Sequence, residues 1–421
     1  MRLHRFFRMK ICVGFALVLM LWQCAPQLRH TAPAVEEVHQ PEIRICLDDS
    51  LREATLRFDG NFLLELEEAR YWFDETIGEL NVSVRGEYLV IKNDKRFFEL
   101  TTPLQVVFQP QYEYNTFYWN DIPYSGKLLL YLDKSHRLVI NQLPVEKYLE
   151  GVVPFEMPTQ NPEYREAIFA QTIAARTYAW YAIEHPENEF YHLFADERDQ
   201  VYRGKLRSSP LIETAIKKTR GKVLALNDHS VRVQFHSTCG GILEVRSDSE
   251  STNGNPNTIT MAYDLMDNEF NCKISPKYRW VEVRTAETVL QNLKHEFQLD
   301  SSLVQKWLDE GFHLTIEVVS RKPGGRVNQL RLVVNEREFL VDGYRIRAVL
   351  RDDVGEMLPS ELFFINQSPT NPGKFYIVGA GYGHGRGMCQ WGAIGMSLRG
   401  YNYHRILNFY YPELSIKTLY Q

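Results

Sequence analysis

Alternating apolar and polar positions dominate the chain from about Pro41 to Pro123. Runs such as EIRICLDD, LNVSVRGEYLVIKN and PLQVVFQP repeat with a period of two, the pattern of strands that bury one face. Asp59-Gly60 and Arg85-Gly86 supply turns between them. The pattern predicts a β-rich N-terminal domain over residues 42–122, and no catalytic cluster is visible in it.

The period changes after a last strand-like run, KLLLYLDKSHRLVINQLP. Following Asn161-Pro162, apolar residues recur at helical spacing from Ala167 to Tyr178. Alanines dominate this stripe, so the sequence predicts a helix that packs closely and is buried on most sides. Later segments add a helical pattern from Ala286 to Glu310 and strands through about Val354. The predicted fold class is α+β, with mixed strands and helices around a groove over residues 123–415.

Glu156 lies between two prolines at the start of the predicted helix, in the segment VVPFEMPTQ. A proline biases the residue before it toward extended backbone, so Val153 and Met157 are expected to be extended around a turn. A carboxyl buried there without a cation would have a raised pKa and suit general-acid catalysis. The alternative is that Glu156 caps the helix or is a solvated turn residue.

A second polar element is the glycine-rich segment GAGYGHGRGMCQWGAIG. Its glycines allow sharp turns and leave Tyr382 and His384 projecting from a bare loop. The loop is interpreted either as part of an active site or as a structural turn with a satisfied histidine. Its spacing matches no nucleotide fingerprint, and no GxxxxGK[ST], HExxH or GxSxG motif occurs. Residues 192–204 and 247–260 are predicted to be polar loops.

Composition and charge narrow the function classes. The chain has 421 residues, 44% of them hydrophobic and 24% charged, which describes a globular protein. Its net charge of -5 argues against nucleic acid as a partner. Basic residues precede the apolar run Ile11–Trp22, so residues 1–24 predict an export signal and residues 25–41 a tether. Cys24 allows a lipid anchor; a cleaved signal or an uncleaved membrane anchor are the alternatives. All three place the body of the protein outside the cytoplasm, in the cell envelope.

Cysteines suggest two kinds of cross-link. An exported protein can form disulfides, and Cys239–Cys272 is the pairing we expect. Alternatively, His236 and Cys239 in FHSTCGG have a spacing that suits zinc, with Cys272 and either His384 or Cys389 as further ligands. A free buried thiol is the third alternative.

Five ordered motifs together resemble the SpoIID/LytB family, which includes stage II sporulation protein D and amidase-enhancer proteins. They are LPVEKYLEGVVPFEMP, AIFAQTIAARTYAW, FHSTCGG, SPKYRW and GYGHGRGMCQWGAIGM, and they cover roughly Tyr124 to Leu414. The sequence departs from the family pattern at Phe155, where a small polar residue is common, and at Cys389, where serine is usual.

The resemblance implies a peptidoglycan lytic transglycosylase whose catalytic acid is Glu156. It implies substrate-binding roles for Arg176, Tyr382, His384 and Gln390, and zinc only in some members. The expected reaction uses one carboxyl group and no required cofactor. It cleaves glycan strands, particularly those stripped of peptides, and leaves 1,6-anhydro-muramic acid ends.

Two other functions remain open from the sequence. Amidase-enhancer members suggest a non-catalytic glycan-binding protein that activates a cell-wall amidase. A metal-dependent peptidoglycan hydrolase would instead need a metal with an open coordination position.

Overall fold

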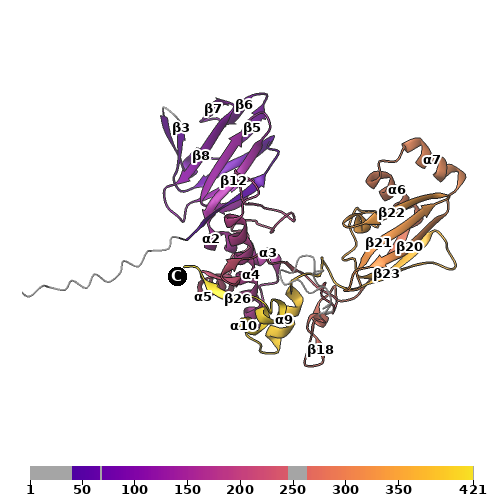
Figure 1. Cartoon of the computed structure of the whole chain (residues 1–421). Helices are drawn as coiled ribbons and strands as arrows, with labels where there is room; N and C mark the ends of the chain where they lie inside the picture. The colour runs from indigo at the N-terminus through magenta and orange to yellow at the C-terminus, as the bar shows by residue number, and fades with distance from the viewer. Residues whose placement is uncertain (1–39, 67–68, 245–262, 421) are drawn as a thin grey trace, which may run out of the picture. The chain divides into compact units, whose positions relative to one another are not determined.

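Two antiparallel sheets form the first part of the computed structural model, which describes residues 40–66, 69–244 and 263–420 (Figure 1). One sheet has the order β13-β1-β12-β11-β8-β3-β4, in which β13 alone is added in parallel, and the other β10-β9-β2-β5-β6-β7. Their strands are β1 (Glu42–Asp48), β2 (Glu53–Asp59), β3 (Phe62–Leu66), β4 (Ala69–Phe73), β5 (Leu80–Arg85), β6 (Tyr88–Lys92), β7 (Phe97–Thr101), β8 (Leu104–Pro110), β9 (Thr116–Trp119), β10 (Ile122–Ser125), β11 (Lys127–Leu132), β12 (Arg137–Pro144) and β13 (Leu193–Phe194).

The two sheets pack face to face through aromatic side chains. The ring of Phe58, from β2, lies 4.8 Å from the ring of Phe62 and 5.3 Å from that of Phe108, which belong to the other sheet. A short 3-10 helix, η1 (Glu75–Ile77), follows β4. Strand β1 pairs along β12 from Glu42 opposite Pro144. The β-rich region therefore continues to Pro144, and the boundary expected after residue 122 falls inside its sheets.

Helix α4 (Arg165–Glu184) is the centre of the second part, and the prediction that it is buried on most sides is confirmed. Small residues at Ala167, Ala170, Ala174 and Ala175 are fully buried, which lets neighbouring elements approach the helix closely. Around it lie α2 (Val145–Glu150), α3 (Val153–Glu156), η2 (Pro162–Tyr164), α5 (Pro210–Lys218), α9 (Gln390–Leu398), α10 (Tyr403–Tyr410) and the sheet of β15 (His229–Ser230), β14 (Lys222–Leu226) and β26 (Ser415–Thr418).

A third group of elements has a hydrophobic core of its own, between residues 280 and 379. It contains the sheets β19-β24-β23 and β20-β21-β22 with three helices. The elements are β19 (Trp280–Thr285), α6 (Ala286–Glu296), α7 (Ser301–Glu310), β20 (Leu314–Arg321), β21 (Val327–Val334), β22 (Arg337–Asp342), α8 (Arg345–Ala348), β23 (Phe363–Gln367) and β24 (Lys374–Gly379). The helix predicted from Ala286 to Glu310 is divided, because Asp300 accepts hydrogen bonds from the backbone of Ser302 and Leu303 and so starts a second helix.

Short elements connect these parts. They are β16 (Phe235–His236), which pairs in parallel with β25 (Met388–Cys389), the hairpin of β17 (Leu265–Met266) and β18 (Glu269–Phe270), and η4 (Asn271–Ile274). The predicted export segment 1–24, most of the tether and the polar loop 247–260 lie outside the described residues. Among the residues that are described, no helix is both long and apolar enough to span a bilayer.

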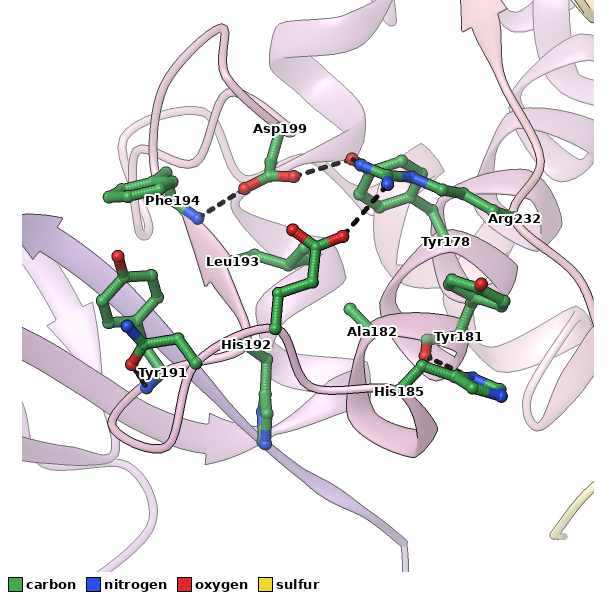
Figure 2. A pocket seen from close by; sticks show the side chains of 12 residues that line it. Tyr178, Tyr181, Ala182, His185, Tyr191, His192, Leu193, Phe194, Asp199 and Arg232 are labelled. Carbon is green, nitrogen blue, oxygen red and sulfur yellow. Dashed lines mark hydrogen bonds and ion pairs between the residues drawn. The ribbon is translucent and has the colours of Figure 1, made fainter.

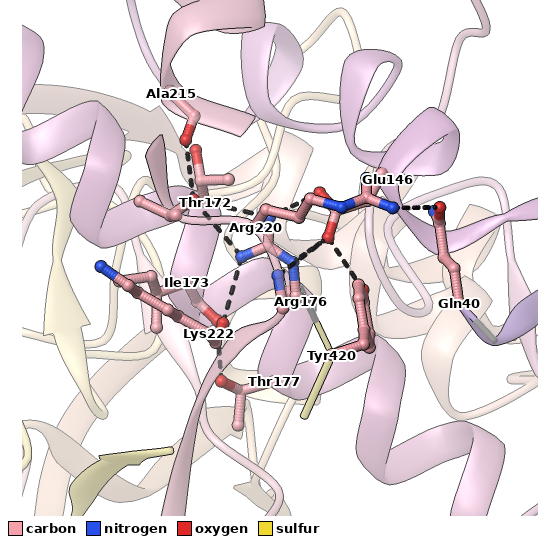
Figure 3. Close-up of polar contacts among 12 residues, drawn as sticks. Gln40, Glu146, Thr172, Ile173, Arg176, Thr177, Ala215, Arg220, Lys222 and Tyr420 are labelled. Carbon is pink, nitrogen blue, oxygen red and sulfur yellow. Dashed lines mark hydrogen bonds and ion pairs between the residues drawn. The ribbon is translucent and has the colours of Figure 1, made fainter. Parts of the chain in front are cut away.

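A buried ion pair joins α2 to α4 (Figure 3). Arg176 donates from Nε to Glu146 Oε1 at 2.9 Å and from Nη2 to Oε2 at 2.7 Å. Glu146 Oε1 also accepts from the backbone N–H of Gly221 and from the Tyr420 hydroxyl. Arg176 donates further to the carbonyl oxygen of Lys222 at 3.1 Å. With side-chain exposures of 1% and 6%, the two charges depend on each other for compensation.

Substituting Glu146→Gln should therefore destabilise the protein strongly, because the Arg176 charge would remain buried without its counter-charge. We expect a loss of about 3–5 kcal/mol in the free energy of unfolding, measured by urea titration. Glu150→Gln is the matched control: its ion pair with Lys147 is more exposed, and its loss should cost less than about 1 kcal/mol. Equal effects of the two substitutions would contradict this interpretation.

Candidate active site

A groove of about 560 Å³ brings together the two polar segments singled out in the sequence. One side comes from α3 and the residues after it, and the other from β16, the glycine-rich loop and the start of α9. The lining residues are Pro154, Phe155, Glu156, Met157, Pro158, Gln160, Arg207, Phe235, His236, Ser237, Tyr382, Gly383, His384, Gln390 and Trp391.

Glu156 is the last residue of α3, a single helical turn. The proline that follows the next residue ends this turn, since Met157 is extended at φ -150° and ψ 160°, as predicted. The expectation of an extended Val153 is wrong. Val153 begins the turn, and Pro154 is tolerated after it because the N–H groups of a first turn have no partner within the helix.

The Glu156 carboxyl is half-buried and accepts two hydrogen bonds. The backbone N–H of Val201 donates to Oε1 at 3.2 Å, and Gln390 Nε2 donates to Oε2 at 3.3 Å. Burial raises the pKa of Glu156 from 4.5 to about 7, because it removes water from the charged form, and the two donors only partly oppose this. The group is thus able to hold a proton near neutral pH.

The segment that carries Val201 is anchored beside a second, smaller pocket of about 200 Å³ (Figure 2). Asp199 accepts from the Tyr178 hydroxyl at 2.7 Å and from the backbone N–H of Phe194 at 2.8 Å. Arg232 donates to the same Tyr178 oxygen at 3.2 Å. These bonds tie the loop to α4 and β13, and so fix the backbone donor that faces Glu156.

Tyr382 and His384 stand in the groove on the glycine-rich loop. The backbones of Tyr382 and Thr238 exchange two hydrogen bonds, of 2.7 and 3.0 Å, which attach the loop to the segment after β16. Glycine is required at 381, where φ is +80° and a Cβ atom would lie 2.6 Å from the carbonyl oxygen of Thr238. Tyr382 is 45% exposed, and His384 Nε2 lies 3.0 Å from the carbonyl oxygen of Phe235.

His236 lies in the same groove, beside His384. Its Nδ1 is 2.9 Å from the carbonyl oxygen of Arg386, while Nε2 has no partner among the described residues. Burial, with the neighbouring His384 and Arg326, holds the pKa of His236 well below its usual range, so the ring is neutral.

Arg176 does not line this groove. It is 1% exposed and engaged with Glu146, so the substrate-binding role expected for it has no support in its position. Because the Arg176 guanidinium is paired with Glu146, it does not lower the pKa of Glu156.

Three cysteines and one aspartate form a separate buried group: Cys239, Asp264, Cys272 and Cys389, whose donor atoms all lie within 4.8 Å of one another. The expected Cys239–Cys272 disulfide is not formed, since both thiols are free and their sulfurs are 3.4 Å apart, against about 2.05 Å in a disulfide. His236 is not a member of this group. The expected zinc pair His236 and Cys239 is therefore divided, with the histidine in the groove and the cysteine in the buried group.

Sequence patterns did not reveal two polar residues that matter here. Glu146 lies two residues after Pro144, in the run LPVEKYL, where an acid in the first helical turn looks like an ordinary surface residue. Asp264 has no local signal at all, because only the fold brings it beside three cysteines. The groove residues Trp391 and Gln160 are likewise recognisable only in the structure.

The fold and the site define an α+β protein with a carboxyl group in a groove between a helical turn and a glycine-rich loop. Residues 133–226 match the family model described as stage II sporulation protein, SpoIID, and residues 241–387 match a domain of unknown function, DUF8618. Together with the relatives described next, the first match confirms the resemblance to the SpoIID/LytB family.

Relatives of known name fit this assignment. The chain is 28% identical to stage II sporulation protein D of Bacillus subtilis over 302 residues, 66% of this chain and 75% of that protein. It is 26% identical to the amidase enhancer of the same organism over 298 residues, 64% of this chain and only 40% of that protein. An uncharacterised protein of Brachyspira hyodysenteriae is 27% identical over 316 residues, 74% of this chain and 76% of its own length.

The raised pKa of Glu156 has a consequence for stability. Between the unfolded value of 4.5 and the folded value of about 7, the folded chain binds more protons, so stability contributed by this group falls as pH rises through that window. Glu156→Gln removes the dependence. We expect the variant to gain about 1–3 kcal/mol over the wild type at pH 8 and much less at pH 5, in urea unfolding at both values. An equal difference at both pH values would contradict the shifted pKa.

Proposed function

We propose that this protein is a peptidoglycan lytic transglycosylase that uses Glu156 as its single acid and base. The observation that supports this most directly is the carboxyl group with a pKa of about 7 in the groove. Among the described residues that line the groove, Glu156 is the only one with a carboxyl group. Ordinary glycosidases need two such groups, whereas formation of an anhydro sugar needs one.

The reaction begins with protonated Glu156. Its proton goes to the oxygen of the glycosidic bond as that oxygen leaves C1 of the muramic acid. The carboxylate then takes the proton of the 6-hydroxyl of the same sugar while the 6-oxygen bonds to C1. The product is a 1,6-anhydro end, no water is consumed, and Glu156 returns to its protonated state.

The residues around Glu156 fit a sugar chain. Phe155, Phe235, Tyr382 and Trp391 offer aromatic faces on which sugar rings can stack. Gln390 donates to Oε2 of Glu156 and so orients the carboxyl before and after proton transfer. Tyr382 is 45% exposed, so its hydroxyl can contact sugar hydroxyl and amide groups.

The alternative function, a glycan-binding protein that activates a partner amidase, is favoured by the similarity to the amidase enhancer of Bacillus subtilis. The groove would then bind glycan without cleaving it. In either case the chain acts on the cell wall outside the cytoplasm, and its N-terminal segment is either a cleaved export signal or a membrane or lipid anchor.

The test is mass spectrometry of purified peptidoglycan after incubation with the full chain in mild detergent. Glycan strands with and without stem peptides serve as substrates. We expect anhydro-muramyl ends from the wild type and a rate about 10²–10⁴-fold lower from Glu156→Gln. Glu163→Gln, which changes an exposed glutamate outside the groove, should cleave like the wild type.

Two results would contradict the proposal. If Glu156→Gln cleaved glycan as fast as the wild type, Glu156 would not be the catalytic acid and base. Absence of anhydro ends from a folded wild type, with retained binding to glycan, would favour the amidase-enhancer function.

A further inference from the structure

The group of Cys239, Asp264, Cys272 and Cys389 has the chemistry of a metal site. All four residues are 0% exposed. Their donor atoms come from separate segments: the turn after β16, the residue before the β17 hairpin, η4, and the residue that caps α9. Donors about 2.3 Å from one zinc ion at tetrahedral angles lie about 3.8 Å apart, and these atoms, within 4.8 Å of one another, need little movement to reach that geometry.

Hydrogen bonds to the sulfur atoms favour thiolates. The backbone N–H groups of Cys239 and Gly392 both donate to the Cys389 sulfur, at 3.2 and 3.3 Å. The N–H of Gly241 donates to the Cys239 sulfur at 3.3 Å. Backbone donors aimed at sulfur stabilise the negative charge that a coordinated cysteine carries.

Hydrogen bonds also fix the carboxylate of Asp264, as is typical of a carboxylate that binds a metal. Oδ1 accepts from the Tyr410 hydroxyl at 2.7 Å and from Asn271 Nδ2 at 2.9 Å. Oδ2, the oxygen left for a metal, lies 3.1 Å from the Cys239 sulfur. A Cβ atom at Gly392 would lie 2.0 Å from the Tyr410 oxygen and 2.8 Å from Oδ2, so the close approach of α9 requires glycine there.

We propose that these four residues bind one zinc ion as a closed structural site. Three thiolates select a soft or borderline cation, and four protein donors complete a tetrahedral shell without an open position. Such a site cross-links segments that are distant in the sequence but adjacent to the groove. Cys389 precedes Gln390, which contacts Glu156, and Cys239 follows Thr238, which pairs with the Tyr382 backbone.

A structural zinc ion would affect the shape of the groove and take no part in the reaction. None of the four ligands lines the groove, so the ion would act by holding the groove walls in place. This inference is independent of the proposed reaction: zinc could be present in a glycan-binding protein, and the transglycosylase chemistry requires no metal.

The experiment measures metal content and thiols in the full chain, purified in detergent without chelator. We expect about one zinc ion per chain after dialysis. Exchange for cobalt(II) should give the intense visible bands of a tetrahedral ion and thiolate-to-cobalt charge transfer in the near ultraviolet. The cobalt spectrum needs no variant, so it remains informative if a substitution prevents folding.

Variants identify the ligands. Cys389→Ser and the conservative Asp264→Asn should each lower zinc retention at least tenfold. Cys46→Ser, which changes a buried cysteine outside the group, should retain zinc like the wild type. Chelation should also lower the unfolding temperature of the wild type and leave that of Cys389→Ser nearly unchanged.

Two outcomes would overturn the proposal. The first is a folded, metal-free wild type whose intact mass is lower by two hydrogens and whose non-reduced peptide map contains a peptide pair linked through Cys239 and Cys272. The second is equal zinc retention by the wild type, Cys389→Ser and Asp264→Asn.

Discussion

The different surroundings of two glutamates are the constraint on which the site depends. Glu146 and Glu156 come from neighbouring helices, yet only Glu146 has a guanidinium partner. Arg176 is held by that pair and by the backbone of Lys222, so its charge is directed away from the groove. Glu156 loses water on burial, which raises the pKa of its carboxyl group, and its two neutral donors oppose this rise only in part. Under the proposed function, the same fold uses Glu146 for stability and Glu156 for chemistry.

The position of the Glu156 donors depends in turn on distant segments. Val201 is held through Asp199 and Tyr178, while Gln390 starts a helix whose cap, Cys389, belongs to the buried group of cysteines. A buried polar network is favourable only when its members are satisfied, so these supporting contacts are as specific as the groove itself. The precision of the site therefore depends on residues that never touch the substrate.

Periodicity in the sequence was enough to predict the α+β class and the buried α4, because both rest on local spacing. The prolines around Glu156 correctly predicted an extended Met157, whereas the extended Val153 was wrong. The family resemblance also implied that Glu156, Tyr382 and His384 belong to one site, and the groove contains all three. Contacts between residues that are distant in the sequence could not be predicted from local spacing. Arg176 looked like a substrate ligand until its partner was visible, and Asp264 acquires its neighbours only through folding. The extent of the β-rich region was missed for the same reason, since β12 pairs with β1 at the other end of that region.

The most direct test of the proposed chemistry is a titration of the Glu156 carboxyl itself. Carbon-13 NMR of the full chain, labelled at the glutamate carboxyl carbons, would identify the Glu156 resonance as the one lost in Glu156→Gln and retained in Glu163→Gln. We predict a midpoint of about 7 for that resonance. A midpoint near the ordinary value of 4.5 would show that the carboxyl is ionised at neutral pH, and would contradict its role as the proton donor.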